Sequence, residues 1–415
     1  MSSTPHPRVA IVVLGEFERS PRMQYHADAL ATSSAEVDVI AYSSERHDCA
    51  SPHVRLHRLR DLPGATSTHL PRPLFLLCAM LRALHQSGQL LYRLLVLPKP
   101  DVILVQNPPA MPTLLVAVLA ARLRAAKLII DWHNFGYTML GLRLGHTHPM
   151  VRLARGYEFA IGRRADVHLC VSRAMLNALR ERGIAATVLY DCPAERFTPT
   201  PVEARRDHFH RLCVAGIVDV PFEEPQRPGI VVSATSWTAD EDFDLLLDAL
   251  RLCDERLCTT AARLMILITG EGPLRARFDA AIARLTLRAI QIRTLWLAPD
   301  DYARLLGSAD LGVSLHRSSS GVDLPMKIAD MFGAGLPVCA FDYGACVTEQ
   351  VQDGETGLLF SSGAQLAQQL FELFSEHPRH TPQLDRLRQN VRAMPPRRWI
   401  DAWNVAAKPL FFDGD

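Results

Sequence analysis

Residues 312–340, GVSLHRSSSGVDLPMKIADMFGAGLPVCA, decide the fold that this sequence predicts. An apolar strand, Leu311–Leu315, runs into a polar turn, and a helix is expected to begin at Asp323 and to end on the Gly-Ala-Gly of residues 333–335. A second apolar strand, Pro337–Phe341, follows. This order is typical of a parallel α/β sheet, in which the turns after the strands carry the binding residues.

The turn has the composition of a phosphate site. It places serine hydroxyls, a glycine and free backbone N–H groups at the start of a helix, where the helix dipole attracts an anion. The carboxylates of Asp323 and Asp330 follow and could accept hydrogen bonds from sugar hydroxyls. Lys327 could neutralise a diphosphate. The pattern suits a sugar nucleotide, and the alternative is an ordinary strand–turn–helix.

Short apolar strands alternate with amphipathic helices through both halves of the chain, which predicts two parallel sheets with crossover helices. A stretch rich in Pro, Arg and Glu, residues 198–228, is expected to be a linker or a surface excursion. The predicted strands are Val9–Leu14, Val37–Ala41, Val102–Val105, Lys127–Ile130, Val167–Val171 and Thr187–Tyr190, then Ile230–Ser233, Leu264–Thr269, Ile290–Thr294, Leu311–Leu315 and Pro337–Phe341.

Composition excludes some classes of function. The formal net charge of +1 gives no global basic field, so we expect no nucleic-acid partner. The 9 cysteines form no CxxC pair and several lie in apolar runs, so they are interpreted as free thiols in a reducing compartment. The N-terminus has no long apolar run before the first strand, and we expect no signal peptide or N-terminal anchor.

Seven further segments resemble a known family in the same order along the chain. The sequence is similar to the GT-B glycosyltransferases, and most closely to the eukaryotic β-1,4-mannosyltransferases that act on chitobiosyl-diphospho-dolichol. Beside the stretch quoted above, the resemblance rests on VVLGEFERSPRMQYHA (12–27), QNPPAMPTL (106–114), IDWHNFGYTML (130–140), VLYDCPAERF (188–197), SATSWTADEDFDLLLDAL (233–250), ITGEGPL (268–274) and TLWLAPDDYARLLGSADLGVSLH (294–316).

This resemblance implies the GT-B fold, with two doubly wound Rossmann-like domains that face each other across a cleft. The expected acceptor domain spans residues 1–197, and a C-terminal helix, 396–415, packs back on it. The expected nucleotide-sugar domain spans residues 229–395. By resemblance the donor contacts His316, Ser319, Ser320, Gly321, Asp323, Leu324 and Lys327, with Asp323 near the hexose and Asp330 at the ribose hydroxyls.

The loop after the first strand is the predicted acceptor site. Gly15 would let the backbone approach a ligand, and Arg19, Ser20 and Arg22 could face the acceptor diphosphate. A solvated strand-to-helix turn is the alternative. The family usually has a second glycine where this chain has Glu18, which adds bulk and negative charge.

The predicted catalytic residues follow the strand Lys127–Ile130. His133 is suited to take a proton from an acceptor hydroxyl, and Asp131 could orient its imidazole. The alternative role of His133 is to satisfy loop hydrogen bonds. Glu158 and Glu18 are the competing candidates for the base.

Two further segments are assigned to the donor site by resemblance. Gly270 and Gly272 end a strand, where they could also form only a tight turn. Trp296 is a base platform or a core residue. We expect no cofactor to be required for the chemistry, and stimulation by a divalent cation (Mg²⁺ or Mn²⁺) is left open. The acidic runs Asp240–Asp242 and Asp300-Asp301 are interpreted as helix starts rather than metal ligands.

The segment Leu74–Leu97 is nearly all apolar, with a narrow polar stripe formed by Arg82, His85, Gln86, Gln89 and Arg93. Polar residues in its middle argue against a spanning helix. A helix that lies in the membrane interface and a helix packed on the sheet remain as alternatives.

The expected function is inverting transfer of mannose from GDP-mannose to a dolichol-linked chitobiose diphosphate. The expected place is the cytosolic face of the endoplasmic reticulum membrane, as a peripheral or monotopic enzyme, with other glycosyltransferases of the pathway as partners. The alternatives are a GT-B enzyme with another sugar nucleotide or lipid acceptor, and a catalytically silent scaffold paralogue.

Overall fold

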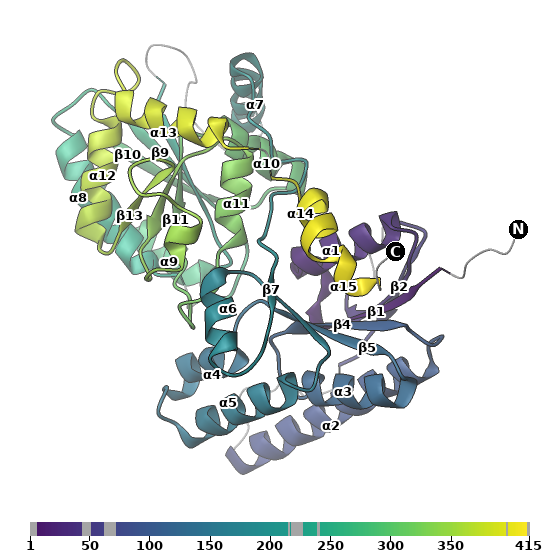
Figure 1. The fold of residues 1–415 in the computed structure, drawn as a ribbon. Helices are drawn as coiled ribbons and strands as arrows, with labels where there is room; N and C mark the ends of the chain where they lie inside the picture. The colour runs from purple at the N-terminus through teal and green to yellow at the C-terminus, as the bar shows by residue number, and fades with distance from the viewer. Residues whose placement is uncertain are drawn as a thin grey trace, which may run out of the picture. The chain divides into compact units, whose positions relative to one another are not determined.

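The computed structural model describes residues 6–43, 51–61, 72–214, 216, 227–238, 241–395 and 397–412, with only the backbone of residues 72–77, 79 and 202. The chain divides into two compact units. One is formed by Met1–Tyr190 with Ile400–Asp415, and the other by Asp191–Trp399. Each unit is built around a parallel β-sheet with helices on it (Figure 1), so the predicted pair of α/β domains is confirmed.

The first unit has a sheet in the order β3-β2-β1-β4-β5-β6-β7. Its central strands are buried on both faces, as parallel strands covered by crossover helices require. Its elements are β1 (Arg8–Glu16), η1 (Phe17–Arg19), α1 (Pro21–Thr32), β2 (Glu36–Tyr42), β3 (Val54–Arg58), α2 (Arg72–Val96), β4 (Val102–Asn107), α3 (Thr113–Arg124), β5 (Lys127–Trp132), α4 (Gly136–Leu144), α5 (Pro149–Gly162), β6 (Val167–Cys170), α6 (Arg173–Arg180) and β7 (Thr187–Val188).

The second unit has a sheet in the order β10-β9-β8-β11-β12-β13. Its elements are α7 (Val202–Val214), β8 (Gly229–Ala234), α8 (Phe243–Leu257), β9 (Leu264–Thr269), α9 (Arg275–Ile282), β10 (Ile290–Leu295), α10 (Pro299–Ser308), β11 (Leu311–Ser314), α11 (Met326–Gly333), β12 (Val338–Phe341), η2 (Val347–Glu349), β13 (Gly357–Phe360), α12 (Gly363–Phe374) and α13 (Pro382–Ala393). Helices α14 (Trp399–Ala406) and α15 (Lys408–Phe411) follow and lie beside α1 (Figure 1).

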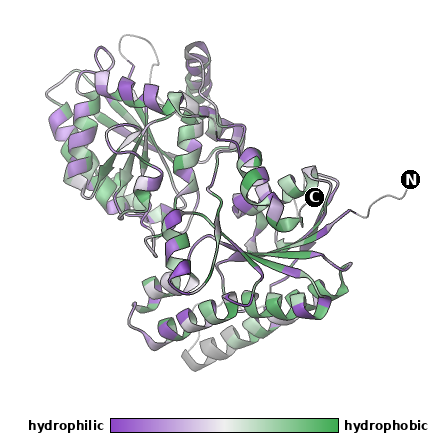
Figure 2. Cartoon of the chain, viewed as in Figure 1, coloured by the Kyte–Doolittle hydropathy of each residue, from purple (hydrophilic) through white to green (hydrophobic). Residues whose placement is uncertain are grey.

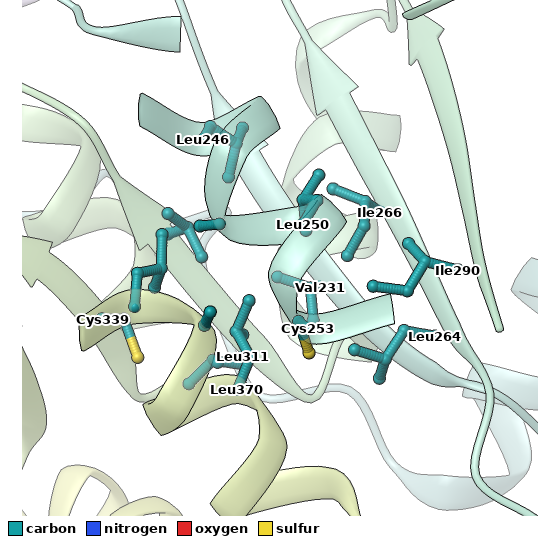
Figure 3. Packing of buried hydrophobic residues seen from close by; sticks show 14 of the residues in the cluster. Val231, Leu246, Leu250, Cys253, Leu264, Ile266, Ile290, Leu311, Cys339 and Leu370 are labelled. Carbon is teal, nitrogen blue, oxygen red and sulfur yellow. The ribbon is translucent and has the colours of Figure 1, made fainter. Parts of the chain in front are cut away.

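The second sheet is covered on both faces by apolar side chains. On one face, Leu246, Leu250 and Cys253 of α8 pack with Leu370 of α12 over the strands (Figure 3). The opposite face holds a second cluster with side chains from α7, α10 and α11. Strands buried on both faces read as continuous apolar runs, which explains why β8 and β9 were visible in the sequence.

Two parts of the fold differ from the prediction. Strands β3 and β13 were not predicted, although both pair in parallel at the edges of their sheets. The stretch 198–228, expected as a linker or surface excursion, carries helix α7, and Phe209 and Leu212 of this helix are buried in the second unit. The 8 cysteines among the described residues are free thiols.

Helix α2 is turned so that its polar stripe contacts protein. Gln86 donates to the Tyr42 hydroxyl (3.0 Å), Gln89 bonds both backbone groups of Arg60, and Arg82 pairs with Asp61 (2.9 Å). Of the apolar side chains of α2, Leu90 and Leu94 are buried, whereas Met80, Leu81, Leu84, Tyr92 and Val96 are exposed. Figure 2 shows that hydrophobic residues fill the central strands of the sheet in the same unit. None of the helices in the described part of the chain is long and apolar enough to cross a membrane.

Candidate active site

The predicted His133–Asp131 pair forms at the carboxyl end of β5. Asp131 is the penultimate residue of the strand and is fully buried, while the side chain of His133 remains 21% exposed. The imidazole Nε2 lies 2.8 Å from the carboxylate Oδ2, and the backbone N–H of His133 donates to Asn107 (2.8 Å). A carboxylate that accepts from Nε2–H leaves the lone pair of His133 on Nδ1.

Arg22 is placed differently from the prediction. Its side chain is only 2% exposed and forms a bidentate ion pair with Asp131, in which Nε donates to Oδ2 (2.7 Å) and Nη2 donates to Oδ1 (2.9 Å). Its remaining nitrogen, Nη1, donates to the carbonyl of Leu189 (2.8 Å). The prediction that Arg22 faces an acceptor diphosphate is therefore wrong, because its guanidinium is enclosed and satisfied by the protein.

The charges around Asp131 keep it ionised. Burial on its own raises the pKa of a carboxyl group, but the Arg22 guanidinium and the His133 imidazole outweigh it. They hold the pKa of Asp131 well below its usual value. His133 therefore has a permanently charged hydrogen-bond acceptor, as a base that must carry a positive charge requires.

Glu158 is excluded as the base by its surroundings. Its side chain is fully buried, and Oε1 accepts from Asn107 Nδ2 (2.7 Å) and from the backbone N–H of Gly136 (2.9 Å). Its Oε2 accepts from the N–H of Tyr137 (3.0 Å). Burial raises the pKa of Glu158, and these bonds oppose that shift. The carboxylate instead satisfies the first N–H groups of helix α4.

The predicted acceptor loop is shorter than expected, because Gly15 still belongs to β1 and η1 begins at Phe17. A Cβ at Gly15 would meet only one side-chain atom, at 4.0 Å, so packing does not require a glycine there. Arg19 is exposed and pairs with Glu16 (2.8 Å). Ser20 precedes α1, and its hydroxyl donates to the Glu16 carbonyl (3.3 Å).

Glu18, the departure from the family, is half-buried in this loop. Its carboxylate accepts a hydrogen bond from the Ser43 hydroxyl (2.6 Å). The glutamate thus ties the turn to the residue that follows β2.

In the second unit, the serine-rich turn closes on Asp323. This carboxylate is 8% exposed and accepts hydrogen bonds from the hydroxyls of Ser318 and Ser320 and from His316 Nε2 (3.0 Å). Gly321 has a φ of 73°, a left-handed conformation that favours glycine, and its N–H donates to Ser318. Asp323 therefore holds the turn together, and its place near the donor hexose stays a prediction.

Helix α11 begins at Met326 rather than at the predicted Asp323. Pro325 is its N-cap, and the proline ring disfavours a helical conformation at Leu324 before it. The helix ends as predicted, since Ala334 is the C-cap and Gly335 has a φ of 70°. Lys327 accordingly lies in the first turn of the helix, where the N–H groups are free of helical partners.

Lys327 forms an ion pair that was not predicted. Its Nζ lies 2.5 Å from Oε1 of Glu241, a carboxylate with 2% exposure, while Lys327 keeps 28% exposure. The second oxygen of Glu241 accepts from the Thr235 hydroxyl (2.5 Å) and the Ser236 N–H (2.9 Å). The acidic run around Glu241 was interpreted as a helix start, which holds for Asp242, the N-cap of α8. Asp240 lies outside the described residues.

Gly270 and Gly272 allow two loops to touch. A Cβ at Gly270 would lie 1.8 Å from the Thr235 carbonyl, and one at Gly272 would lie 1.8 Å from the Ser236 carbonyl. The indole of Trp237 donates to the Gly270 carbonyl (3.0 Å). These glycines therefore position the loop that carries Glu241, in addition to any contact with a nucleotide.

The side chains of Trp296 and Asp330 are both left available for contact with a ligand. Trp296 is 59% exposed, which excludes the core alternative. Asp330 is half-buried, and no donor among the described residues bonds its carboxylate. Burial and the neighbouring Asp191 carboxylate raise the pKa of Asp330 to about 8, while Arg196 opposes this shift. A carboxyl group that has no hydrogen-bond donor within the protein is suited to bond the hydroxyls of a ribose.

Among the residues that the structure places, no three His, Cys, Asp or Glu side chains gather in a way that could hold a metal ion. Asp300 and Asp301 lie in the first turn of α10, where acidic side chains stabilise the helix dipole.

Both units match models of glycosyltransferase domains. Residues 20–190 match the glycosyl transferase 4-like domain, and residues 227–376 match the glycosyl transferases group 1. The crystal structure of WaaG, a glycosyltransferase involved in lipopolysaccharide biosynthesis, is similar with a TM-score of 0.65 at 16% sequence identity, covering 96% of this chain and 99% of that chain. The fold is therefore that of a GT-B glycosyltransferase.

Relatives by sequence narrow this class. The Arabidopsis thaliana UDP-glycosyltransferase TURAN is 41% identical over 97% of each chain. The chitobiosyldiphosphodolichol beta-mannosyltransferases of mouse (Mus musculus) and human (Homo sapiens) are each 38% identical, over 97% and 98% of this chain and 88% and 92% of theirs. The chain belongs to the family of the chitobiosyldiphosphodolichol beta-mannosyltransferases.

Proposed function

We propose that this enzyme transfers mannose from GDP-mannose to the distal N-acetylglucosamine of a dolichol-linked chitobiose diphosphate. The observation that carries the proposal is the imidazole of His133, partly exposed and held by the buried carboxylate of Asp131. The names of the mouse and human relatives support the acceptor and the sugar.

The chemistry follows from the two sites. His133 takes the proton of the acceptor hydroxyl on Nδ1, the hydroxyl oxygen forms a bond to the anomeric carbon of mannose, and the bond to GDP breaks. The electron pair leaves with the diphosphate, whose charge Lys327 and the first N–H groups of α11 stabilise. A single displacement of this kind inverts the anomeric configuration. We propose that these groups suffice without a cofactor.

A direct assay tests the proposal. The purified protein is incubated with a synthetic chitobiosyl-diphospho-lipid and, in parallel, with GDP-mannose, UDP-glucose and UDP-N-acetylglucosamine. The expected result is a β-mannosylated product from GDP-mannose alone. The UDP donors are included because the Arabidopsis relative bears the name of a UDP-glycosyltransferase. Turnover of a UDP donor would overturn the donor assignment, and no turnover with any donor would favour the scaffold alternative.

The same assay tests the cation requirement. Equal rates with EDTA and with Mg²⁺ or Mn²⁺ are expected if Lys327 and the helix N-terminus neutralise the leaving diphosphate. Loss of turnover with EDTA would show that a divalent cation is needed and would contradict the proposed role of Lys327.

Replacement of Lys327 by alanine should weaken GDP binding. A charge-assisted bond to a diphosphate contributes about 1.5–3 kcal/mol, so we expect a loss of roughly tenfold to a hundredfold in affinity by isothermal titration calorimetry. Glu241 loses its cation in this variant, so thermal unfolding is measured in parallel.

Lys408→Ala is the matched control, because this lysine lies in the first unit, on α15. Its GDP affinity should equal that of the unchanged protein. If Lys327→Ala also binds GDP normally while remaining folded, Lys327 does not contact the diphosphate.

We further propose that the enzyme binds a lipid surface through the first unit, on the cytosolic face of the endoplasmic reticulum. Helix α2 packs against α3, α3 against α5, and α5 against α4. Each of these helices exposes large apolar side chains, with Leu115, Leu119 and Leu123 on one face of α3 because they are a turn apart. We call α2 to α5 the lipid face; its further exposed apolar residues are Met80, Leu81, Leu84, Tyr92, Val96, Met139, Leu142, Leu144, Met150 and Leu153.

The charge of the lipid face indicates an anionic membrane. Between residues 72 and 165, the acidic residues are Asp101, Asp131 and Glu158, and the latter two are buried. The exposed basic side chains of α3 to α5 are Arg122, Arg143, Arg152 and Arg155, and the first exposed carboxylate after α5 is Asp166. Apolar area with arginines and almost no exposed carboxylates is the pattern of interfacial helices that bind anionic lipids.

Polar substitutions on α2 should release the enzyme from vesicles. We expect Met80→Ser with Leu81→Ser and Leu84→Gln to reduce flotation with phosphatidylserine-containing liposomes by at least about tenfold, since each CH₂ removed from the lipid costs about 0.8 kcal/mol and the loss of two already corresponds to this factor. Leu77 belongs to the same predicted face, but its side chain lies outside the described residues. The thermal midpoint of the triple variant should stay unchanged.

Leu90→Ser on the same helix is the matched control, because Leu90 is fully buried. It should lower the thermal midpoint of unfolding and leave flotation of the folded fraction unchanged. A triple variant that unfolds, or that floats like the unchanged protein, would show that α2 packs in the core instead. If the protein bound purely zwitterionic liposomes as strongly as phosphatidylserine-containing ones, the role of the arginines would be contradicted.

A further inference from the structure

The carboxylate of Asp131 is shared by three side chains. Oδ1 accepts from Arg22, and Oδ2 accepts from Arg22, from His133 (2.8 Å) and from Nε2 of His26 (3.2 Å). Arg22 and His26 both project from helix α1, and both are buried. No role is predicted for His26 from the sequence.

The last part of the chain completes this network. The indole Nε1 of Trp403, on α14, donates to Nδ1 of His26 (3.0 Å), and Trp403 is fully buried. The ring of Phe411, on α15, packs beside both side chains. An indole N–H can only donate, so Nδ1 of His26 must accept. The single proton of His26 is then on Nε2, where it donates to Asp131.

This arrangement keeps His26 neutral. A histidinium carries protons on both nitrogens and would turn an N–H against the indole N–H of Trp403. Burial acts in the same direction and lowers the pKa of His26, as do the positive charges of Arg22 and His133, while Asp131 opposes the shift. The Arg22 cation already balances the Asp131 anion. A second cation beside the pair would disfavour proton uptake by His133.

We propose that His26 is a positioning residue for His133, and that Trp403 makes it so by fixing its neutral Nε2–H tautomer. His26 directs a hydrogen bond at the same carboxylate oxygen that holds His133, without adding charge. The inference rests on the proposed role of His133 as the base. Helix α14, which carries Trp403, is then part of the hydrogen-bond network that holds the His133 imidazole.

Spectra of the protein without substrates test the tautomer directly. Two-bond ¹H–¹⁵N correlations of histidine-labelled protein, assigned with His26→Gln, should show Nε2–H at His26 and no protonation of this ring down to about pH 6. Nδ1–H, or a histidinium at that pH, would overturn the inference. This measurement does not depend on mannose transfer. Absence of turnover in the unchanged enzyme would contradict the proposed function, but it would not affect the tautomer assigned to His26.

The kinetic test uses Trp403→Phe, which keeps an aromatic ring and removes the N–H. His26 can then take a proton on Nδ1, so we expect kcat to fall about fivefold to tenfold near pH 6 and to change less than twofold near pH 8.5, with KM unchanged. Adding His26→Gln should restore the profile, because glutamine keeps an N–H for Asp131 and does not titrate in this range.

Two controls separate this effect from packing. Phe411→Leu disturbs the same apolar contact and leaves the indole N–H in place. Any fall in the kcat of this variant should therefore be the same at every pH. His26→Leu removes the donor to Asp131 and should lower kcat across the whole range. Equal pH profiles for Trp403→Phe and Phe411→Leu, or no rescue by His26→Gln, would overturn the inference. If Trp403→Phe does not fold, the spectra of the unchanged protein decide.

Discussion

Replacing His133 by alanine is expected to lower kcat by roughly a hundredfold or more, because a positioned general base contributes about 10²- to 10⁴-fold to such a reaction. GDP affinity should remain near that of the unchanged enzyme. His133 lies in the first unit, and the predicted diphosphate contacts lie in the second. Steady-state kinetics and GDP titration on the same preparation measure both quantities.

A second histidine–aspartate pair in the same unit gives a matched control. His57 Nε2 lies 2.8 Å from Oδ1 of Asp38, the same distance as in the His133–Asp131 pair. His57→Ala should leave kcat unchanged. Near-normal turnover of His133→Ala would move the role of base to Glu18, since Glu158 is enclosed by its three donors.

Replacing Arg22 by alanine is expected to destabilise the first unit by about 3–5 kcal/mol, because it leaves the buried charge of Asp131 without its partner. The pKa of Asp131 is lower in the folded protein than in the unfolded chain. The ionised Asp131 therefore stabilises the fold at pH values above the pKa of the unfolded chain. This stabilisation is lost as the pH falls through the lower pKa of the folded protein. Denaturant unfolding at neutral pH measures the loss.

A double variant separates stability from activity. Arg22→Met with Asp131→Leu replaces the buried pair by apolar side chains and should recover much of the stability, while kcat stays low because His133 has no acceptor. If Arg22 instead contacted an acceptor diphosphate, Arg22→Ala would raise KM for the acceptor and leave unfolding unchanged. That outcome would contradict the buried pair.

The central strands of both sheets could be predicted because burial on both faces makes them continuous apolar runs. Strand β3 carries Arg55, His57 and Arg58 and so gives no such run. Strand β13, at the edge of its sheet, was missed although Leu358, Leu359 and Phe360 are apolar. Helix α7 was missed because its stretch is rich in charge, although Phe209 and Leu212 supply an apolar contact.

The residue types of the candidate site were visible in the sequence, but their partners were not. His133 and Asp131 are two residues apart, so their pairing followed from local geometry. The partners Arg22 and Asp131 are 109 residues apart, and no local pattern reports such a contact. The start of α11 was misplaced although Pro325 gave the signal, since a proline disfavours helix at the residue before it.

Glu241 shows the same limit in the second unit. A glutamate in an acidic run before a helix resembles a capping residue, and only the fold shows that Lys327 reaches it. Glu158 shows the reverse case, since a carboxylate near the predicted base serves the backbone of α4.

The contact between Trp403 and His26 joins parts of the chain that are 377 residues apart, and it bears on how such enzymes can be recombined. A chimera that exchanged everything after Tyr190 would bring a foreign indole, or none, to His26. An exchange confined to Asp191–Trp399 would keep the native one. A hybrid enzyme with a new donor specificity should therefore exchange only the second unit, with one junction before Asp191 and the other after Trp399. The first unit then keeps both Trp403 and His26 from the same parent.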